Sequence, residues 1–287
     1  MDVKAGIKRR FAGIKRRFSG VSWQHPVAQR AMPLIDGADR LVRIRRDLGH
    51  LPAYSIRIRG NGVSDEFGGR KFVRTGDYLT GSLVKYAGLT PKSRVLEIGS
   101  GAGRIPYSLK GILLSSGCYT GLDVDSVSVH ACQASQTLTS AGFTFVHADL
   151  HSDLYNDGGS GNAATYSLPF DDGTFDVVYL ESVFTHLTGE ECANYAKEIL
   201  RVLKAGGRAV VSGFLRDLGT GDSPFTFQHQ VGEVYVEYSD NPRKAVAADT
   251  ETFGTWFGHP HSQRLRGSWR GDAGEYPNGQ DWLIFTK

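Results

Sequence analysis

One short segment, residues 95–104, constrains the fold of this chain more than any other. It reads Val-Leu-Glu-Ile-Gly-Ser-Gly-Ala-Gly-Arg, an apolar strand that runs into three alternating glycines and then into a helical stretch. Such a junction places backbone N–H groups at a helix N-terminus, where a polar or anionic group can dock. The segment therefore predicts a nucleotide-like ligand site or, as the plainer interpretation, an ordinary glycine turn.

Short apolar runs alternate with helical patterns along most of the chain, which is typical of a parallel sheet covered by helices on both faces. The expected strands are 94–98, 118–123, 143–148, 175–180, 208–213, one near 264–269 and a last one at 281–286. Helices are expected at 75–89, at 250–257 and after a capping box at Thr188 and Glu191, this last helix ending at Gly206 and Gly207. Residues 51–69 mix loop and strand signals, and residues 214–246 show little periodicity.

The spacing around the glycines separates several kinds of nucleotide site. A dinucleotide fingerprint needs glycine or alanine at the sixth position, where this chain has Arg104. A P-loop is excluded because no Gly-Lys-Ser/Thr follows. Glu97, inside the end of the strand, would repel a diphosphate but would attract a cofactor that carries a sulfonium and an ammonium group.

Two further carboxylates follow the next two predicted strands. Asp123 comes about 20 residues after the loop, where a carboxylate can accept both ribose hydroxyls, as in NAD proteins. Asp149 follows the third strand and could accept a hydrogen bond from an adenine amino group. Asp123 could instead cap a helix near Ser126, and Asp149 could cap a turn. We favour a ligand site because open α/β sheets bind ligands at this edge.

The motifs together resemble those of the class I S-adenosylmethionine-dependent methyltransferases over most of residues 70–287. The resemblance includes the glycine loop, Gly-Leu-Asp at 121–123, Ala-Asp at 148–149, the stretch 168–176 and Leu-Arg-Val-Leu-Lys-Ala-Gly-Gly at 200–207. The stretch Ser-Val-Phe-Thr-His-Leu at 182–187 and the closing residues 280–287 resemble a bacterial subgroup. Ala205 departs from the proline usual before the two glycines.

This resemblance implies an α/β fold with a Rossmann-like seven-stranded sheet, in which only the last strand is antiparallel and helices cover both faces. It implies that Glu97 and the glycines hold the methionine part of S-adenosylmethionine, Asp123 the ribose, and Asp149 with Leu150 the adenine. The full predicted cofactor-binding set is Glu97, Gly99, Ser100, Gly101, Gly103, Arg104, Asp123, Val124, Asp149 and Leu150.

Methyl transfer needs a base only where the acceptor is a hydroxyl or a protonated amine. Glu181 and His186 are the predicted catalytic residues, because they leave the fourth strand where this fold brings acceptor and sulfonium together. Glu181 could instead bind the amino group of the cofactor, and His186 could be a packed or capping residue beside Thr188. The remaining histidines have no spacing that indicates a metal site, so none is predicted.

The N-terminal part differs in charge from the rest. Residues 1–60 hold fourteen Lys/Arg and four Asp/Glu, whereas residues 61–287 hold nineteen and twenty-six. The heptapeptide Ala-Gly-Ile-Lys-Arg-Arg-Phe at 5–11 recurs at 12–18 and has an apolar stripe with cationic flanks at helical spacing. Two interpretations stay open: weak contact of residues 3–18 with an anionic membrane surface, or a solvated leader.

The predicted organisation is a basic amphipathic arm at 1–20, a lead-in at 21–72 and a methyltransferase domain at 73–287 with an acceptor lid at 215–246. Three scattered cysteines and no apolar run long enough to span a bilayer favour the cytoplasm, with peripheral membrane contact as the open alternative. The expected reaction is methyl transfer to an O or N atom of a small molecule or glycan. The alternatives are an RNA methyltransferase that uses the arm and an NAD-type oxidoreductase, although the arm resembles no nucleic-acid-binding module.

Overall fold

The computed structural model describes residues 26–61, 65–114, 117–271 and 279–287. The chain divides into two compact units, Met1–Thr75 and Gly76–Lys287, which are described one by one. The predicted basic arm lies outside the described residues. In the part that the structure describes, no helix is both long and apolar enough to cross a membrane.

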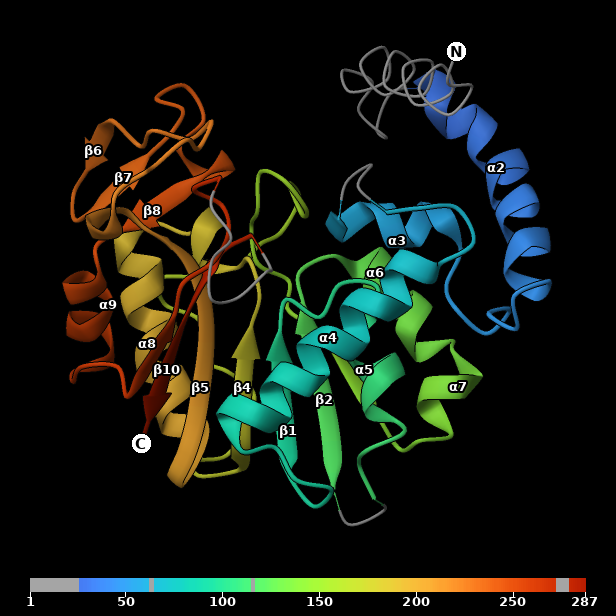
Figure 1. The fold of residues 1–287 in the computed structure, drawn as a ribbon, viewed down its shortest axis with the longest axis horizontal. Helices are drawn as coiled ribbons and strands as arrows, with labels where there is room; N and C mark the ends of the chain where they lie inside the picture. Colours follow the sequence, from blue (N-terminus) through green and yellow to red (C-terminus); the bar gives the residue numbers. More distant parts are fainter. Residues whose placement is uncertain (1–25, 62–64, 115–116, 272–278) are drawn as a thin grey trace, which may run out of the picture. The chain divides into compact units, whose positions relative to one another are not determined.

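The first unit contains α2 (Pro26–Ile44), α3 (Tyr54–Asn61) and the start of α4 (Arg70–Ala87) (Figure 1). The expectation of loop and strand over 51–69 is wrong, because α3 is a helix. Ile56 and Ile58 alternate with arginines as they would in a strand. The helix is instead held by tertiary contacts, because buried Arg57 pairs with Asp39 at 2.9 Å and Asp65 at 2.6 Å.

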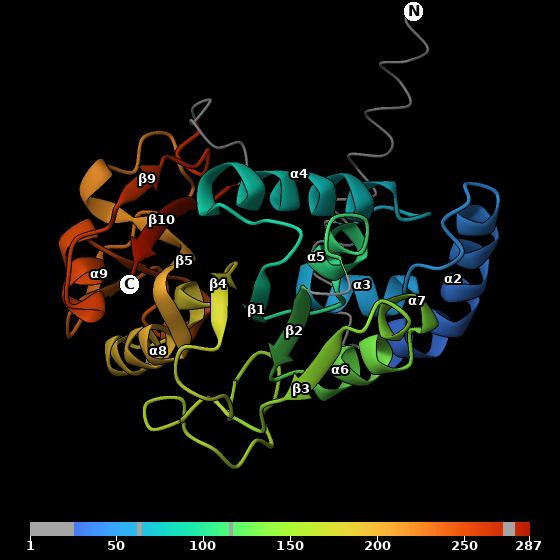
Figure 2. The same cartoon turned by 90° about the horizontal axis from the view of Figure 1, so that it is seen from below.

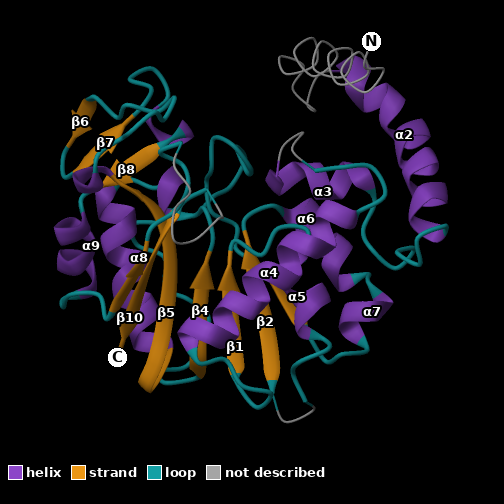
Figure 3. Ribbon diagram, viewed as in Figure 1, coloured by secondary structure: helices purple, strands orange, loops and turns teal. Residues whose placement is uncertain are grey.

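The second unit is built on a parallel sheet with the order β3-β2-β1-β4-β5. Four strands have the predicted bounds: β1 (Arg94–Ile98), β2 (Cys118–Asp123), β4 (Phe175–Leu180) and β10 (Asp281–Thr286). β3 (Thr144–His147) is shorter than predicted, and β5 (Leu203–Leu215) is longer. β10 pairs antiparallel with β5, as expected for the closing strand (Figure 3).

Helices cover both faces of this sheet, which confirms the predicted Rossmann-like α/β architecture (Figure 2). On one face lie α4 from Gly76 onward, α5 (Arg104–Leu109) and α6 (Ser126–Gln133), with the short α7 (Gln136–Thr139) following α6. On the other face lie α8 (Gly189–Val202) and α9 (Thr250–Phe257). The central strands are therefore buried on both sides, and Leu96 and Val178 are fully enclosed.

The start of α8 is confirmed and its end is not. Thr188 and Glu191 form the predicted capping box. The helix ends at Val202, because Leu203 already has extended backbone and begins β5. Gly206 and Gly207 therefore lie inside the strand, and their predicted role as the stop of the helix is wrong.

The sheet is also larger than the seven strands expected, with ten among the described residues. Residues 214–246, predicted to have little regular structure, contain β6 (His229–Val231), β7 (Val234–Val236) and the start of β8 (Val246–Ala248). β9 (Gln263–Leu265) pairs with β10. β6, β7 and β9 make antiparallel pairs, so β10 is not the only antiparallel strand. These strands of three residues are too short for a readable alternation.

Candidate functional site

The glycine loop after β1 needs glycine at three positions. Gly99, Gly101 and Gly103 have φ values of 81°, 49° and 80°, a region that other residues rarely adopt. A Cβ atom on Gly99 would lie 2.6 Å from Cγ2 of Val183. The N–H groups of Gly99 and Ser100 donate to the carbonyl of Leu122 at 2.8 and 3.2 Å, which ties the loop to the end of β2.

The carboxylate of Asp123, the last residue of β2, also binds the glycine loop. One carboxylate oxygen accepts the N–H of Gly101 at 2.6 Å, and the other accepts the N–H of Asp125 at 2.7 Å. The N-cap of α6 is Asp125, so Asp123 does not have the alternative role of capping that helix. Burial raises the pKa of Asp123 despite these bonds. The carboxylate is therefore buried and rigidly placed.

Glu97 is a second buried carboxylate at this edge. The hydroxyl of Tyr119 donates to its Oε2 atom. Burial raises the pKa of Glu97 to about 8, although Tyr119 and the positive charge of Arg104 act in the opposite direction. The negative charges of Asp123 and Glu181 add to the rise. Glu97 is thus largely protonated at neutral pH.

Glu181, which directly follows β4, is a third carboxylate at this edge and is partly buried. Its Oε2 atom accepts hydrogen bonds from the Tyr179 hydroxyl at 2.7 Å and from Trp282 Nε1 at 3.0 Å. Burial raises its pKa, and the charge of Arg104 opposes the rise. Three carboxylates from three strand ends thus influence one electrostatic environment, in which Arg104 supplies positive charge to Glu97 and Glu181.

A cavity of about 100 Å³ opens beside Asp123 at the carboxyl edge of the sheet. Five predicted residues line it: Gly99, Asp123, Val124, Leu150 and His186. Seven do not: Glu97, Ser100, Gly101, Gly103, Arg104, Asp149 and Glu181. The lining residues that the sequence did not indicate include Tyr155, Tyr195 and Arg243. Tyr195 was visible only as part of the apolar face of α8, and Arg243 gave no signal.

His186 has a defined tautomer in this cavity. Its Nδ1 atom lies 2.8 Å from the carbonyl oxygen of Arg243, which can only accept, so Nδ1 carries the proton and Nε2 is a free acceptor. Burial lowers the pKa of His186, which keeps the ring neutral. Arg243 is itself fixed by Glu191 at 2.6 Å, and the ring of Tyr155 meets His186 edge-on at 6.2 Å.

Asp149 is exposed and engaged by the loop that follows it. It accepts hydrogen bonds from Ser160 Oγ at 2.7 Å and Asn156 Nδ2 at 3.2 Å, and these donors lower its pKa. Gly161 comes so close that a Cβ there would lie 2.9 Å from the carbonyl of Asp149. The glycine-rich segment 156–162 is therefore bonded to the end of β3 at the rim of the cavity.

A network of hydrogen bonds that the sequence did not indicate surrounds Ser182, which follows Glu181 and lines the cavity. Ser182 has a φ of 61°, unusual for a residue with a side chain. Its N–H donates to Ser212 Oγ at 2.7 Å, and its Oγ accepts from Gln280 Nε2 at 2.8 Å. Ser212 donates to Gln280 Oε1 at 2.6 Å. The network fixes the turn that positions Glu181.

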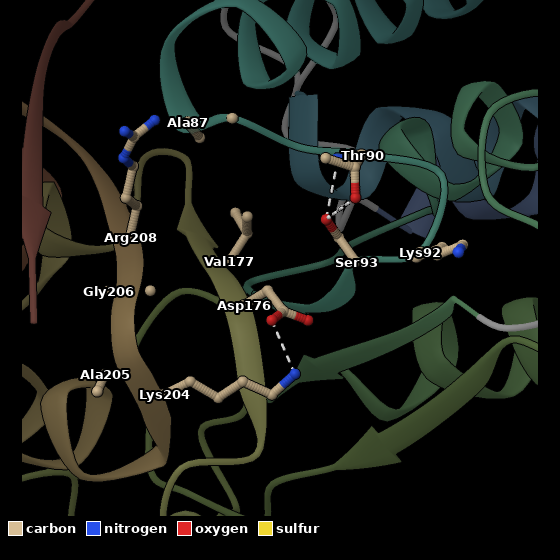
Figure 4. Close-up of a pocket in the computed structure, with 12 residues that line it drawn as sticks. Ala87, Thr90, Lys92, Ser93, Asp176, Val177, Lys204, Ala205, Gly206 and Arg208 are labelled. Atoms are coloured by element: carbon tan, nitrogen blue, oxygen red, sulfur yellow. Dashed lines mark hydrogen bonds and ion pairs between the residues drawn. The ribbon is translucent and has the colours of Figure 1, made fainter.

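A second cavity, of about 440 Å³, lies at the opposite, amino edge of the sheet (Figure 4). Two of its three cationic side chains contact protein groups, since Lys204 binds Asp176 at 2.7 Å and Arg208 reaches the carbonyl of Tyr86 at 3.5 Å. Ligands of parallel α/β sheets bind outside the carboxyl ends of the strands. The first cavity is therefore the candidate site. The described residues contain no cluster of metal-ligating side chains.

Residues 96–211 match the model of a family described as a methyltransferase domain. The PH0226 protein of Pyrococcus horikoshii OT3 has a similar structure, with a TM-score of 0.51 and 16% identity over 76% of this chain and 91% of that chain. Weaker similarity links the chain to S-adenosylmethionine-dependent methyltransferases of Aquifex aeolicus (TM-score 0.47, 14% identity, 79% and 96% covered) and Methanosarcina mazei (0.46, 18%, 71% and 96%).

The fold and the family match define a Rossmann-like methyltransferase domain. These findings support the class I S-adenosylmethionine-dependent methyltransferase predicted from the motifs. The chain is therefore an enzyme that uses S-adenosylmethionine as its methyl donor, and the alternative of an NAD-type oxidoreductase does not hold.

Proposed function

We propose that this enzyme transfers the methyl group of S-adenosylmethionine to an O or N atom of a small molecule or glycoconjugate. The observation that carries the proposal is Glu181, a partly buried carboxylate at the exit of β4, held by Tyr179 and Trp282, whose pKa is raised by desolvation. A raised pKa suits a general base, because it brings proton affinity closer to the working pH.

The residues at the carboxyl edge fit the cofactor. S-Adenosylmethionine carries a sulfonium and an ammonium group, and the edge offers the carboxyl groups of Glu97, Asp123 and Glu181. Asp123 would accept the ribose hydroxyls, since each oxygen keeps a lone pair beyond its backbone bond. The cavity beside Val124 and Leu150 would take the adenine. Gly99 allows the close approach that a side chain would block.

Glu181 would act on the acceptor as follows. S-Adenosylmethionine would supply an activated methyl group to the acceptor oxygen or nitrogen, and its sulfur would be left as a neutral thioether. The Glu181 carboxylate would take the proton that the acceptor loses. Tyr179 and Trp282 hold the carboxylate by its Oε2 atom, which fixes its orientation. The activated donor makes positioning the larger part of catalysis.

A labelling experiment tests the proposal. The protein is incubated with S-adenosylmethionine carrying a tritiated methyl group and with separated small-molecule, glycan, RNA and protein fractions of a cell extract. We expect label in the small-molecule or glycan fraction. Label confined to RNA or protein would overturn the proposed acceptor class.

The role of Glu181 is tested with the acceptor so found. Glu181→Gln should lower kcat by about a hundredfold and leave the Kd for S-adenosylmethionine unchanged. Glu190→Gln, an exposed position on α8, is the matched control and should change neither. A weakened Kd with kcat preserved would instead assign Glu181 to the cofactor's ammonium group.

A further inference from the structure

Helix α2 turns an apolar stripe away from the unit that contains it. Leu34, Leu41 and Ile44 are 80%, 63% and 52% exposed, which is unusual for large aliphatic side chains. On a helix, steps of seven and three residues return to nearly the same side, so the three lie along one face. Gly37 and Ala38, also exposed, lie between them. The face has no partner among the described residues of the first unit.

Hydrogen bonds on the opposite side fix this orientation. Asp36 accepts the N–H and the hydroxyl of Ser55 at 2.8 and 2.6 Å. Asp39 is fully buried and accepts Arg57 at 2.9 Å and the N–H of Gly68 at 2.7 Å. Arg43, one turn further on, also binds Asp39, at 2.7 Å. Rolling α2 to hide its apolar stripe would leave buried charges without partners, which is costly.

The same bonds determine the charge of the outer face. Both carboxylates of α2 are used on the inner side, so none is exposed along its described residues. The exposed charges beside the stripe are cationic: Arg30 and Arg40 on the helix and Arg45 directly after it. The first exposed carboxylate after these, Asp47, comes in the following turn. An apolar stripe flanked by arginines complements a surface whose outermost groups are anionic and whose next layer is apolar.

We propose that α2 docks along an anionic phospholipid surface, with Leu34, Leu41 and Ile44 inserted at the level of the acyl chains and the arginines at the phosphates. Amphipathic helices with basic flanks bind membrane interfaces in this way. The basic heptapeptide repeat ends at residue 18, eight residues before α2 begins. Stable peripheral binding takes two signals, and the repeat would supply the second. The interaction adds a location to the enzyme and does not depend on its acceptor.

Co-sedimentation of the full chain with vesicles tests the proposal. The vesicles consist of phosphatidylcholine alone or of equal parts phosphatidylcholine and phosphatidylglycerol. We expect binding only to the mixed vesicles, and the triple variant Leu34→Ser, Leu41→Ser, Ile44→Ser should weaken it about tenfold. The matched control is Leu114→Ser, Val127→Ser, Val231→Ser, which removes three exposed aliphatic side chains of the second unit and should bind like the wild type.

Three results would overturn the proposal. The first is equal sedimentation of the wild type and the α2 triple variant. The second is loss of binding on deletion of residues 1–20 with no dependence on the α2 stripe in the full chain. The third is a wild-type dimer in light scattering that the α2 variant abolishes and that vesicles do not disturb, because the stripe would then join two copies of the chain. Circular dichroism and titration with S-adenosylmethionine on the same variants separate docking from folding and from the enzyme's own activity.

Discussion

Carboxyl groups at the two edges of the central sheet differ in how burial shifts their pKa values, apart from the exposed Asp149 at the carboxyl edge, whose pKa is lowered by hydrogen bonds. At the amino edge, burial acts to raise the pKa of Asp176, but hydrogen bonds from Lys204 and the N–H of Arg94 outweigh it, and the net pKa is lowered. At the carboxyl edge, burial prevails, and the pKa values of Glu97, Asp123 and Glu181 are all raised. At the amino edge Asp176 is paired with Lys204. At the carboxyl edge, three carboxyl groups have too little positive charge nearby to offset the effect of burial on their pKa values.

This difference indicates which edge is made for a ligand. Buried carboxylates with too little compensation destabilise a fold, and proteins retain such groups mainly where function needs them. A cofactor that carries a sulfonium and an ammonium group would complete the charge balance. The cavity at the amino edge is larger, but its one carboxylate, Asp176, is already paired with Lys204.

The largest expected effect is at Asp123. Asp123→Asn removes a charge and places an amide donor against the N–H of Gly101 or Asp125, so both the ribose contact and the glycine loop suffer. We expect the Kd for S-adenosylmethionine to rise about a hundredfold in calorimetric titration. Asp176→Asn at the opposite edge is the control and should leave the Kd unchanged. An equal rise in the Kd for both substitutions would contradict the claim that only the carboxyl edge binds the cofactor.

A smaller effect is expected at His186, which faces the cofactor cavity with a free Nε2 acceptor. His186→Gln should weaken cofactor binding about tenfold while kcat at saturating cofactor changes little. The measurement is a pair of steady-state titrations, one for each substrate. A large fall in kcat with unchanged cofactor affinity would support the catalytic role predicted from the sequence.

The smallest effect concerns stability near the amino edge. Glu198 accepts hydrogen bonds from Arg201, Leu168 and Ser167, which hold its pKa at about 2. Because this pKa is lower in the folded state, the stabilisation is present above pH 4.5 and is lost as the pH falls toward 2. Glu198→Gln should lower the free energy of unfolding by about 2 kcal/mol at pH 7, flatten its decline in acid and leave cofactor affinity alone. Urea unfolding at several pH values measures both; an unchanged acid profile would contradict the assignment.

The sequence predicted the elements whose pattern is local. β1 and β4 have continuous apolar runs, and the capping box at Thr188 marks the start of α8 without reference to the rest of the fold. The helix α3 was missed because Arg57 stabilises it through Asp39, eighteen residues away. The glycine positions and Asp123 were placed by the same local reasoning.

The remainder of the site depends on contacts that no local pattern contains. Arg243 reaches His186 across 57 residues, and Gln280 reaches Ser182 across 98. The sequence indicated the residue types at the strand ends, but not that Tyr155 would line the cavity or that Asp149 would be occupied by Ser160. Side chains from distant segments define the shape of the cavity. The residues next to each strand end supply the glycines and carboxyl groups of the site.

Proton release on cofactor binding tests the central claim most directly. Glu97, with a pKa of about 8, is mostly protonated at pH 7 before the cofactor binds, and a nearby cation would favour its ionised form. Calorimetric titration of S-adenosylmethionine at pH 7, in two buffers of different ionisation enthalpy, should show release of nearly one proton by the wild type and almost none by Glu97→Gln. Equal proton release by both proteins would contradict the claim that Glu97, at the carboxyl edge, ionises when the cationic cofactor binds.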